Sequence, residues 1–209
     1  MRPEKLGILL VVSGPSGTGK STICAKLRKK YPKLHFSVSC TTRAPRPGEK
    51  DGEDYYFISE NEFRKKIKQN AFLEYARVHS NFYGTLKTEV YPKLHQGIDV
   101  LLDIDVQGAM QIKNKGKKDK LLKKCLELAF IGPPSFAELE RRLRTRATEN
   151  EKTIEKRLKR AKQELKYWNK YDYLIINKEL KKAENDMVNL LDILHKKTSR
   201  LKDSGFYEK

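Results

Sequence analysis

Short apolar runs alternate with stretches of mixed apolar and charged residues along most of the chain. The apolar runs are rich in β-branched residues, which is typical of buried parallel strands, and they cover 7–13, 100–105, 126–131 and 173–177. The mixed stretches space their apolar residues for one face of a helix, and they cover 22–30, 90–96, 107–115, 135–146, 148–167 and 180–201. Strands that alternate with helices predict an α/β fold: a three-layer core around a parallel sheet.

Residues 36 to about 90 have a different pattern, with several short strands and one helix. Ser59 and Glu62 form a capping box that begins this helix. The predicted strands cover 34–40, 55–58, 72–78 and the segment around 81–84. We interpret this region as a mixed α/β lobe inserted into the core.

The segment Gly14 to Ser21 reads Gly-Pro-Ser-Gly-Thr-Gly-Lys-Ser, which fits G-x-x-x-x-G-K-[ST] at every fixed position. It follows a predicted strand and precedes a predicted helix, as a phosphate-binding P-loop requires. The glycines let successive backbone N–H groups turn inward, Lys20 would reach the β- and γ-phosphates, and the Ser21 hydroxyl would ligate Mg²⁺. The motif therefore predicts a nucleoside-triphosphate site.

The charge balance narrows the possible partners. The chain has 209 residues and a formal net charge of +18, which favours anionic partners, either nucleotides in a cleft or nucleic acid over a patch. The lysines at 113–124 are more simply explained as a solvated surface, so we regard nucleic acid as the less favoured partner. Three cysteines without C-x-x-C or metal-ligand spacing indicate reduced thiols. The apolar run at the N-terminus is too short to span a membrane, so we expect a cytoplasmic protein without membrane contact.

A longer set of motifs resembles the guanylate kinases. These motifs are the phosphate loop, residues 36–49 (Phe-Ser-Val-Ser-Cys-Thr-Thr-Arg-Ala-Pro-Arg-Pro-Gly-Glu), Asp54-Tyr55, Tyr83-Gly84, Leu-Asp-Ile-Asp at 102–105 and Arg-Leu-Arg-Thr-Arg at 142–146. The resemblance extends to about Asn177. It implies one domain over 1–209 in three parts: a core (1–35, 91–134 and 171–209), a GMP-binding lobe (about 36–90) and a lid (about 135–170).

The resemblance also implies roles for individual residues. Those expected to bind ATP are Gly14, Pro15, Ser16, Gly17, Thr18, Gly19, Lys20, Ser21, Thr22 and Asn177. Those expected to bind GMP are Ser39, Arg43, Arg46, Tyr55, Glu74, Tyr83, Thr85 and Asp105. Those expected to act in catalysis are Lys20, Arg43, Arg142, Arg146 and Arg157. Ser21 and Asp103 are expected to serve Mg²⁺, although a swapped or shared role with Asp105 remains open.

The chemistry of these residue types agrees with the implied reaction, which is the transfer of the γ-phosphoryl group of ATP to GMP and also to dGMP. Arginine grips phosphate groups bidentately, where lysine acts as a point charge. Guanine presents N1–H and N2–H₂ as adjacent donors that one carboxylate at Glu74 can accept together, whereas adenine presents an acceptor at N1. No general base is needed because the GMP phosphate is largely deprotonated, so positioning and charge stabilisation would carry catalysis.

Three alternatives remain at this stage. The chain could be a non-catalytic guanylate-kinase-like module that binds acidic peptides, although its complete phosphate loop disfavours this. It could also be an RNA-binding P-loop protein, or a kinase acting on another nucleoside monophosphate. We also predict that Trp168 and the leucines of the last helix are core residues. No pattern in the chain predicts an oligomeric state.

Overall fold

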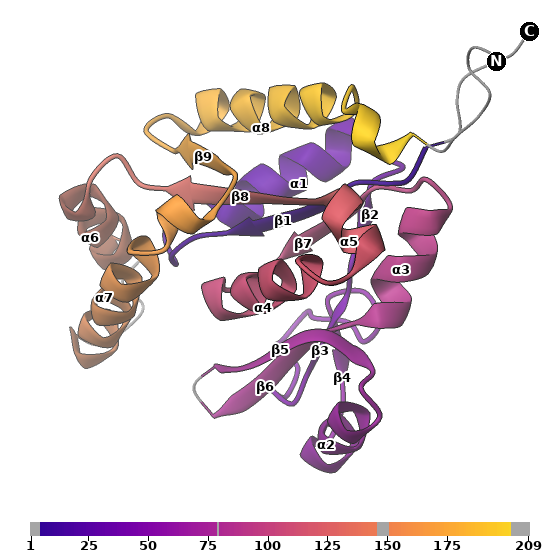
Figure 1. The fold of residues 1–209 in the computed structure, drawn as a ribbon. Helices are drawn as coiled ribbons and strands as arrows, with labels where there is room; N and C mark the ends of the chain where they lie inside the picture. Colours follow the sequence, from indigo (N-terminus) through magenta and orange to yellow (C-terminus); the bar gives the residue numbers. More distant parts are fainter. Residues whose placement is uncertain (1–4, 79, 146–150, 202–209) are drawn as a thin grey trace, which may run out of the picture.

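The computed structural model describes residues 5–78, 80–145 and 151–201. At its centre lies a five-stranded sheet in the order β2-β7-β1-β8-β9, in which all neighbouring strands are parallel (Figure 1). The strands are β1 Leu9–Ser13, β2 His35–Phe36, β7 Val100–Asp103, β8 Leu126–Gly132 and β9 Tyr173–Ile176. The predicted three-layer α/β core is therefore confirmed.

Helices cover both faces of this sheet. Alternate residues of β1 point to opposite sides and are apolar on both, so each face is buried under a helical layer. Leu10 and Val12 pack toward α1 and α8, and Leu9 and Val11 pack toward the opposite helical layer. The helices of the two layers are α1 Lys20–Lys30 and α8 Leu180–Leu194 on one face, and α3 Lys87–His95, α4 Val106–Gly116 and α5 Lys120–Cys125 on the other. Within the described residues, none of the helices is both long and apolar enough to cross a membrane.

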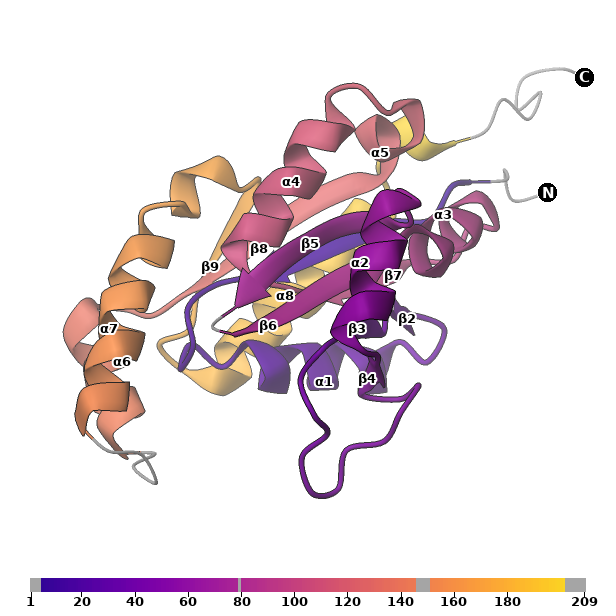
Figure 2. The same ribbon diagram turned by 90° about the horizontal axis from the view of Figure 1, so that it is seen from below.

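The inserted lobe has its own four-stranded sheet, in the order β4-β3-β6-β5. Its small core forms where Phe63 stacks on Phe72 and Phe82, with ring centroids 4.4 and 5.2 Å apart. Figure 2 shows β5 lying beside α4 of the core, a contact that joins the two parts. The elements of the lobe are β3 Ser39–Thr41, β4 Tyr55–Phe57, α2 Glu60–Lys68, β5 Phe72–Val78 and β6 Asn81–Leu86.

The segment that we expect to form the lid consists of two helices beside the far edge of the core sheet, α6 Phe136–Thr145 and α7 Glu151–Leu165 (Figure 1). They pack on each other through Leu139, Leu143 and Ala161. Two 3₁₀ turns complete the described chain, η1 Trp168–Lys170 before β9 and η2 Thr198–Arg200 after α8.

Two of the predicted strands were wrong in detail. The expected strand at 34–40 is two short strands in different sheets, because β2 pairs with β7 of the core and β3 pairs with β6 of the lobe. The alternation of apolar residues is real, but the chain passes from one sheet to the other within it. The strand expected to reach Asp105 ends at Asp103, and Asp105 instead caps α4 by accepting a hydrogen bond from the Gly108 backbone N–H at 2.9 Å.

Other differences follow from local capping and exposure. The lysine-dense segment contains a helix, α5, because Asp119 accepts hydrogen bonds from the backbone N–H groups of Leu121 and Leu122. The last helix ends at Leu194 rather than near residue 201. Trp168 was predicted to be a core residue, but its side chain is 51% exposed because it lies in a turn between the lid and β9.

Candidate functional site

The phosphate loop adopts a conformation that its glycines make possible. Gly14 and Gly19 have φ angles of 148° and 87°, which other residues rarely adopt. A Cβ on Gly14 would lie 2.2 Å from the Ile131 carbonyl oxygen, so the loop can cross the end of β8 only without a side chain there. The Lys20 ammonium donates a hydrogen bond to the Gly14 carbonyl at 2.6 Å, which places its charge inside the loop at the start of α1.

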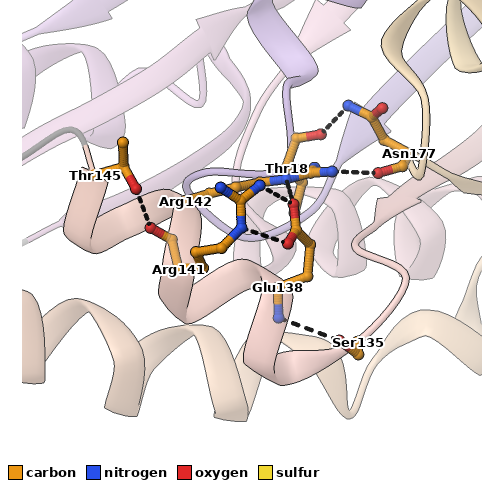
Figure 3. Close-up of polar contacts among 7 residues, drawn as sticks. All are labelled: Thr18, Ser135, Glu138, Arg141, Arg142, Thr145 and Asn177. Atoms are coloured by element: carbon orange, nitrogen blue, oxygen red, sulfur yellow. Dashed lines mark hydrogen bonds and ion pairs between the residues drawn. The ribbon is translucent and has the colours of Figure 1, made fainter.

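Asn177, at the end of β9, holds the loop and the lid together (Figure 3). Its side-chain NH₂ group donates to the Thr18 backbone carbonyl oxygen at 2.8 Å. The backbone carbonyl oxygen of Asn177 accepts from the Arg142 guanidinium at 2.9 Å. Arg142 also donates to Glu138 at 2.8 Å. These contacts connect the phosphate loop, the end of β9 and α6.

The two aspartates after β7 have different partners. Asp103 lies near Ser21, with the hydroxyl and carboxylate oxygens 3.4 Å apart. Burial raises the pKa of Asp103, against the opposing effects of the Lys20 charge and the Ser21 hydrogen bond. Asp105 binds the backbone of α4 and accepts from the Arg160 guanidinium of α7 at 3.1 Å. A hydroxyl beside a carboxylate suits Mg²⁺, which takes few protein ligands and completes its shell with phosphates and water.

Glu74 lies on β5 and is buried, with 4% of its surface exposed. One oxygen, Oε1, accepts from the Thr85 backbone N–H at 3.0 Å and from the Thr85 hydroxyl at 2.6 Å. Burial raises the pKa of Glu74 to about 7; the Thr85 bonds oppose the shift, the Asp105 charge adds to it, and the Lys115 ammonium opposes it. The opposing groups do not offset the burial, so this carboxyl group changes charge near neutral pH.

The arginines predicted to bind the GMP phosphate lie on the loop after β3. Arg43 pairs with Glu49 at 2.8 Å and lies over the Tyr55 ring, 5.4 Å from its centroid. Glu49 also accepts from the backbone N–H of Arg46, whose side chain is exposed. The hydrogen bond that Arg43 donates to the Glu49 carboxylate raises the pKa of the guanidinium.

A cavity of about 460 Å³ lies between the phosphate loop, the lobe and α7. The predicted residues on its wall are Gly14, Pro15, Ser16, Gly17, Gly19, Lys20, Ser21, Thr22, Ser39, Tyr55, Glu74, Tyr83, Asp103, Asp105 and Arg157. The predicted residues away from its wall are Thr18, Arg43, Arg46, Thr85, Arg142 and Asn177. Arg146 lies outside the described residues.

Sequence reasoning missed three charged residues of α7 that line this cavity, Lys156, Arg160 and Glu164. Arg160 pairs with Glu164 at 2.8 Å and with Asp105 at 3.1 Å. A signal for them was available: Lys156, Arg160 and Glu164 follow one another at intervals of four residues, and Arg157 precedes Arg160 by three, which places them on one face of a helix.

Comparisons with known proteins show the family of the chain. The guanylate kinase family model matches residues 7–194. The guanylate kinase of Fusobacterium nucleatum is 49% identical over 90% of this chain and 97% of its own, and that of Thermotoga maritima is 42% identical over 94% and 92%. A crystal structure of guanylate kinase from Anaplasma phagocytophilum, 33% identical, superimposes with a TM-score of 0.77 over 96% of this chain and 93% of its own. The chain therefore belongs to the guanylate kinase family.

Proposed function

We propose that the cavity between the phosphate loop and the lobe holds ATP and GMP end to end and is the site of phosphoryl transfer. The reaction of the family is the protein's own: it transfers the γ-phosphoryl group of ATP to GMP and gives ADP and GDP. The observation that carries the proposed site is that the phosphate loop, Glu74 and the charged face of α7 line one cavity.

On the donor side, the amide groups of the phosphate loop and the Lys20 ammonium would bind the ATP phosphates. Ser21 and Asp103 would hold Mg²⁺, which supplies charge neutralisation at the phosphate oxygens when bound. Asn177 would act indirectly: its bonds to Thr18 and Arg142 would keep the loop in position.

Replacing Asp103 with asparagine is expected to raise the Mg²⁺ concentration needed for half-maximal activity by about 10- to 100-fold, the usual cost of losing a group that orients a metal. The measurement is a Mg²⁺ titration of the initial rate at saturating ATP and GMP. Asp105→Asn is the matched control, because Asp105 pairs with Arg160 rather than with Ser21. If only the Asp105 variant shifts the titration, the roles of the two aspartates are exchanged.

On the acceptor side, the GMP phosphate would be bound by Tyr55, Tyr83, Arg43 and Arg46. The guanine base would be faced by Ser39, Glu74 and Asp105. Arg43 pairs with Glu49, and Asp105 pairs with Arg160. Binding would therefore exchange these internal partners for the phosphate and the base. Arg142, Arg146 and Arg157 remain our proposed lid arginines, and closure of the lobe and lid would bring them to the transferring group and exclude water.

The raised pKa of Glu74 predicts how GMP use depends on pH. Guanine donors need the ionised carboxylate, so kcat/KM for GMP should fall as the pH drops below about 7, approaching about tenfold per pH unit. Phosphate esters titrate near pH 6, so a separate change of slope in the pH profile near 6 would come from the phosphate of GMP. The Glu74→Gln variant should lose the change of slope near 7 and keep the one near 6. A wild-type profile flat from pH 8 to 6.5 would contradict the assignment.

The raised pKa of Glu74 has the opposite effect on folding stability: GMP use should increase with pH, whereas stability should decrease. The pKa of Glu74 is about 7 in the folded state and 4.5 in the unfolded state, so the folded state binds the proton more tightly. The stability from this group is therefore fully present below pH 4.5 and is lost as the pH rises through about 7.

The proposed function is tested by ADP release with GMP, dGMP, AMP, UMP and CMP as acceptors. We expect GMP and dGMP to stimulate ADP release and the other three to do so weakly. Salt-dependent binding of polyanions without GMP-stimulated ADP release would instead support the RNA-binding alternative. We also propose a cytoplasmic location, which three free and buried thiols in the described residues fit.

A further inference from the structure

Gly108, in the first turn of α4, contacts both carboxylates proposed to read guanine. Its backbone N–H donates to Asp105 at 2.9 Å. A Cβ built on it would lie 2.4 Å from Oε2 of Glu74, closer than real Cβ atoms come to other atoms, and 3.0 Å from Cδ of the same side chain. The space that a side chain would occupy is therefore filled by the Glu74 carboxylate.

The backbone of Gly108 does not itself require glycine. Gly108 is not among the residues with positive φ angles, and it lies within a regular helix. Alanine has a higher helix propensity than glycine at such a position. The requirement for a residue without a side chain therefore comes from packing against Glu74.

The neighbouring structure prevents an easy adjustment. Thr85 holds Oε1 of Glu74 through two hydrogen bonds, so the carboxylate cannot turn away without losing them. The helix is also fixed to β5 on both sides of Glu74. Gln111 exchanges hydrogen bonds with the backbone of Tyr75, at 2.7 and 3.2 Å, and the Lys115 ammonium donates to the Leu73 carbonyl.

We propose that Gly108 is a positioning residue for base recognition: its missing side chain leaves the space in which Glu74 presents Oε2 to guanine. It acts through Glu74 and Asp105 rather than by contact with the reacting atoms. The inference rests on the proposed role of Glu74, and the experiments below separate the two.

Gly108→Ala is expected to raise KM for GMP about tenfold, the cost of disturbing one hydrogen bond to a charged group, and to leave KM for ATP unchanged. The preference for GMP over AMP in kcat/KM should fall by a similar factor. Gly116→Ala is the matched control in the same helix, because its Cβ would meet the end of the Leu126 side chain at 3.1 Å and the Leu122 Cβ at an ordinary contact distance of 3.8 Å, and neither residue lines the cavity. An equal rise in KM for both substrates would indicate general distortion and overturn the inference.

A double-mutant cycle with Glu74→Asp gives a second test. Aspartate is one methylene shorter, so its carboxylate would withdraw from the added methyl group. Gly108→Ala should therefore raise KM for GMP much less in the Glu74→Asp background than in the wild type. The same rise in both backgrounds would overturn the inference. If Glu74→Gln impairs GMP use and Gly108→Ala does not, only this inference fails; if Glu74→Gln is without effect, the proposed role of Glu74 fails.

Discussion

Replacing Lys20 with methionine is expected to lower kcat by about 10²- to 10³-fold, the cost of removing one group that stabilises charge in a transition state. Lys20 places its ammonium within the phosphate loop by donating to the Gly14 carbonyl at 2.6 Å. Its charge is proposed to follow the transferring phosphoryl group from ATP to GMP. Methionine has similar length and helix propensity, so the substitution removes the charge and leaves α1 intact.

The measurement is kcat for ADP release at saturating ATP and GMP, together with the circular dichroism spectrum and Tm. Lys26→Met is the control, because Lys26 is an exposed lysine of the same helix and lies off the cavity wall. Turnover near that of the wild type in a folded Lys20→Met protein would rule out the loop as the donor site.

The parts of the site that could be predicted from the sequence are those carried by contiguous residues. The phosphate loop needs glycines, a lysine and a hydroxyl at fixed spacing between a strand and a helix, and all of these are visible in one segment. The cavity wall includes Lys20 and Ser21 as that motif predicts. The element types were also largely predictable, since their apolar residues follow the periods of strands and helices.

The remaining features depend on contacts between segments far apart in the chain. The burial of Glu74 is set by Thr85 and α4, and a single carboxylate on a strand carries no sign of it. Asp105 looked like the end of a strand because the apolar run continues to it, but its side chain caps α4. Trp168 was assigned to the core on hydrophobicity alone, which does not report where a turn lies on the surface.

Internal ion pairs engage two of the residues proposed to bind GMP. Arg43 is neutralised by Glu49, and Asp105 by Arg160. Exchanging each internal partner for a phosphate or a base leaves none of these charges buried without a partner. The buried Glu74 is different, since no ion pair to its carboxylate is present among the described residues. Its carboxylate must stay in place to accept hydrogen bonds from guanine.

Replacing Glu74 with glutamine is expected to lower kcat/KM for GMP roughly 10²-fold, in line with the free energy of hydrogen bonds to a charged group. The two Thr85 donors require an acceptor, so the glutamine oxygen should take the place of Oε1 and its NH₂ group that of Oε2. That NH₂ would then face the donors of guanine. It would, however, match the acceptor at N1 of adenine, so the preference for GMP over AMP should fall further than the activity with GMP.

The fold should tolerate this change, because the amide keeps the Thr85 bonds and removes a charge that burial already disfavours. At pH 8 we therefore expect a Tm equal to or above that of the wild type. The measurement is kcat/KM for GMP and AMP at that pH, with Glu62→Gln as control, because Glu62 is exposed on α2 and pairs with Lys66 at 3.7 Å. If the ratio of kcat/KM for GMP to kcat/KM for AMP is the same in the Glu74 variant and in the control, a group other than Glu74 recognises guanine.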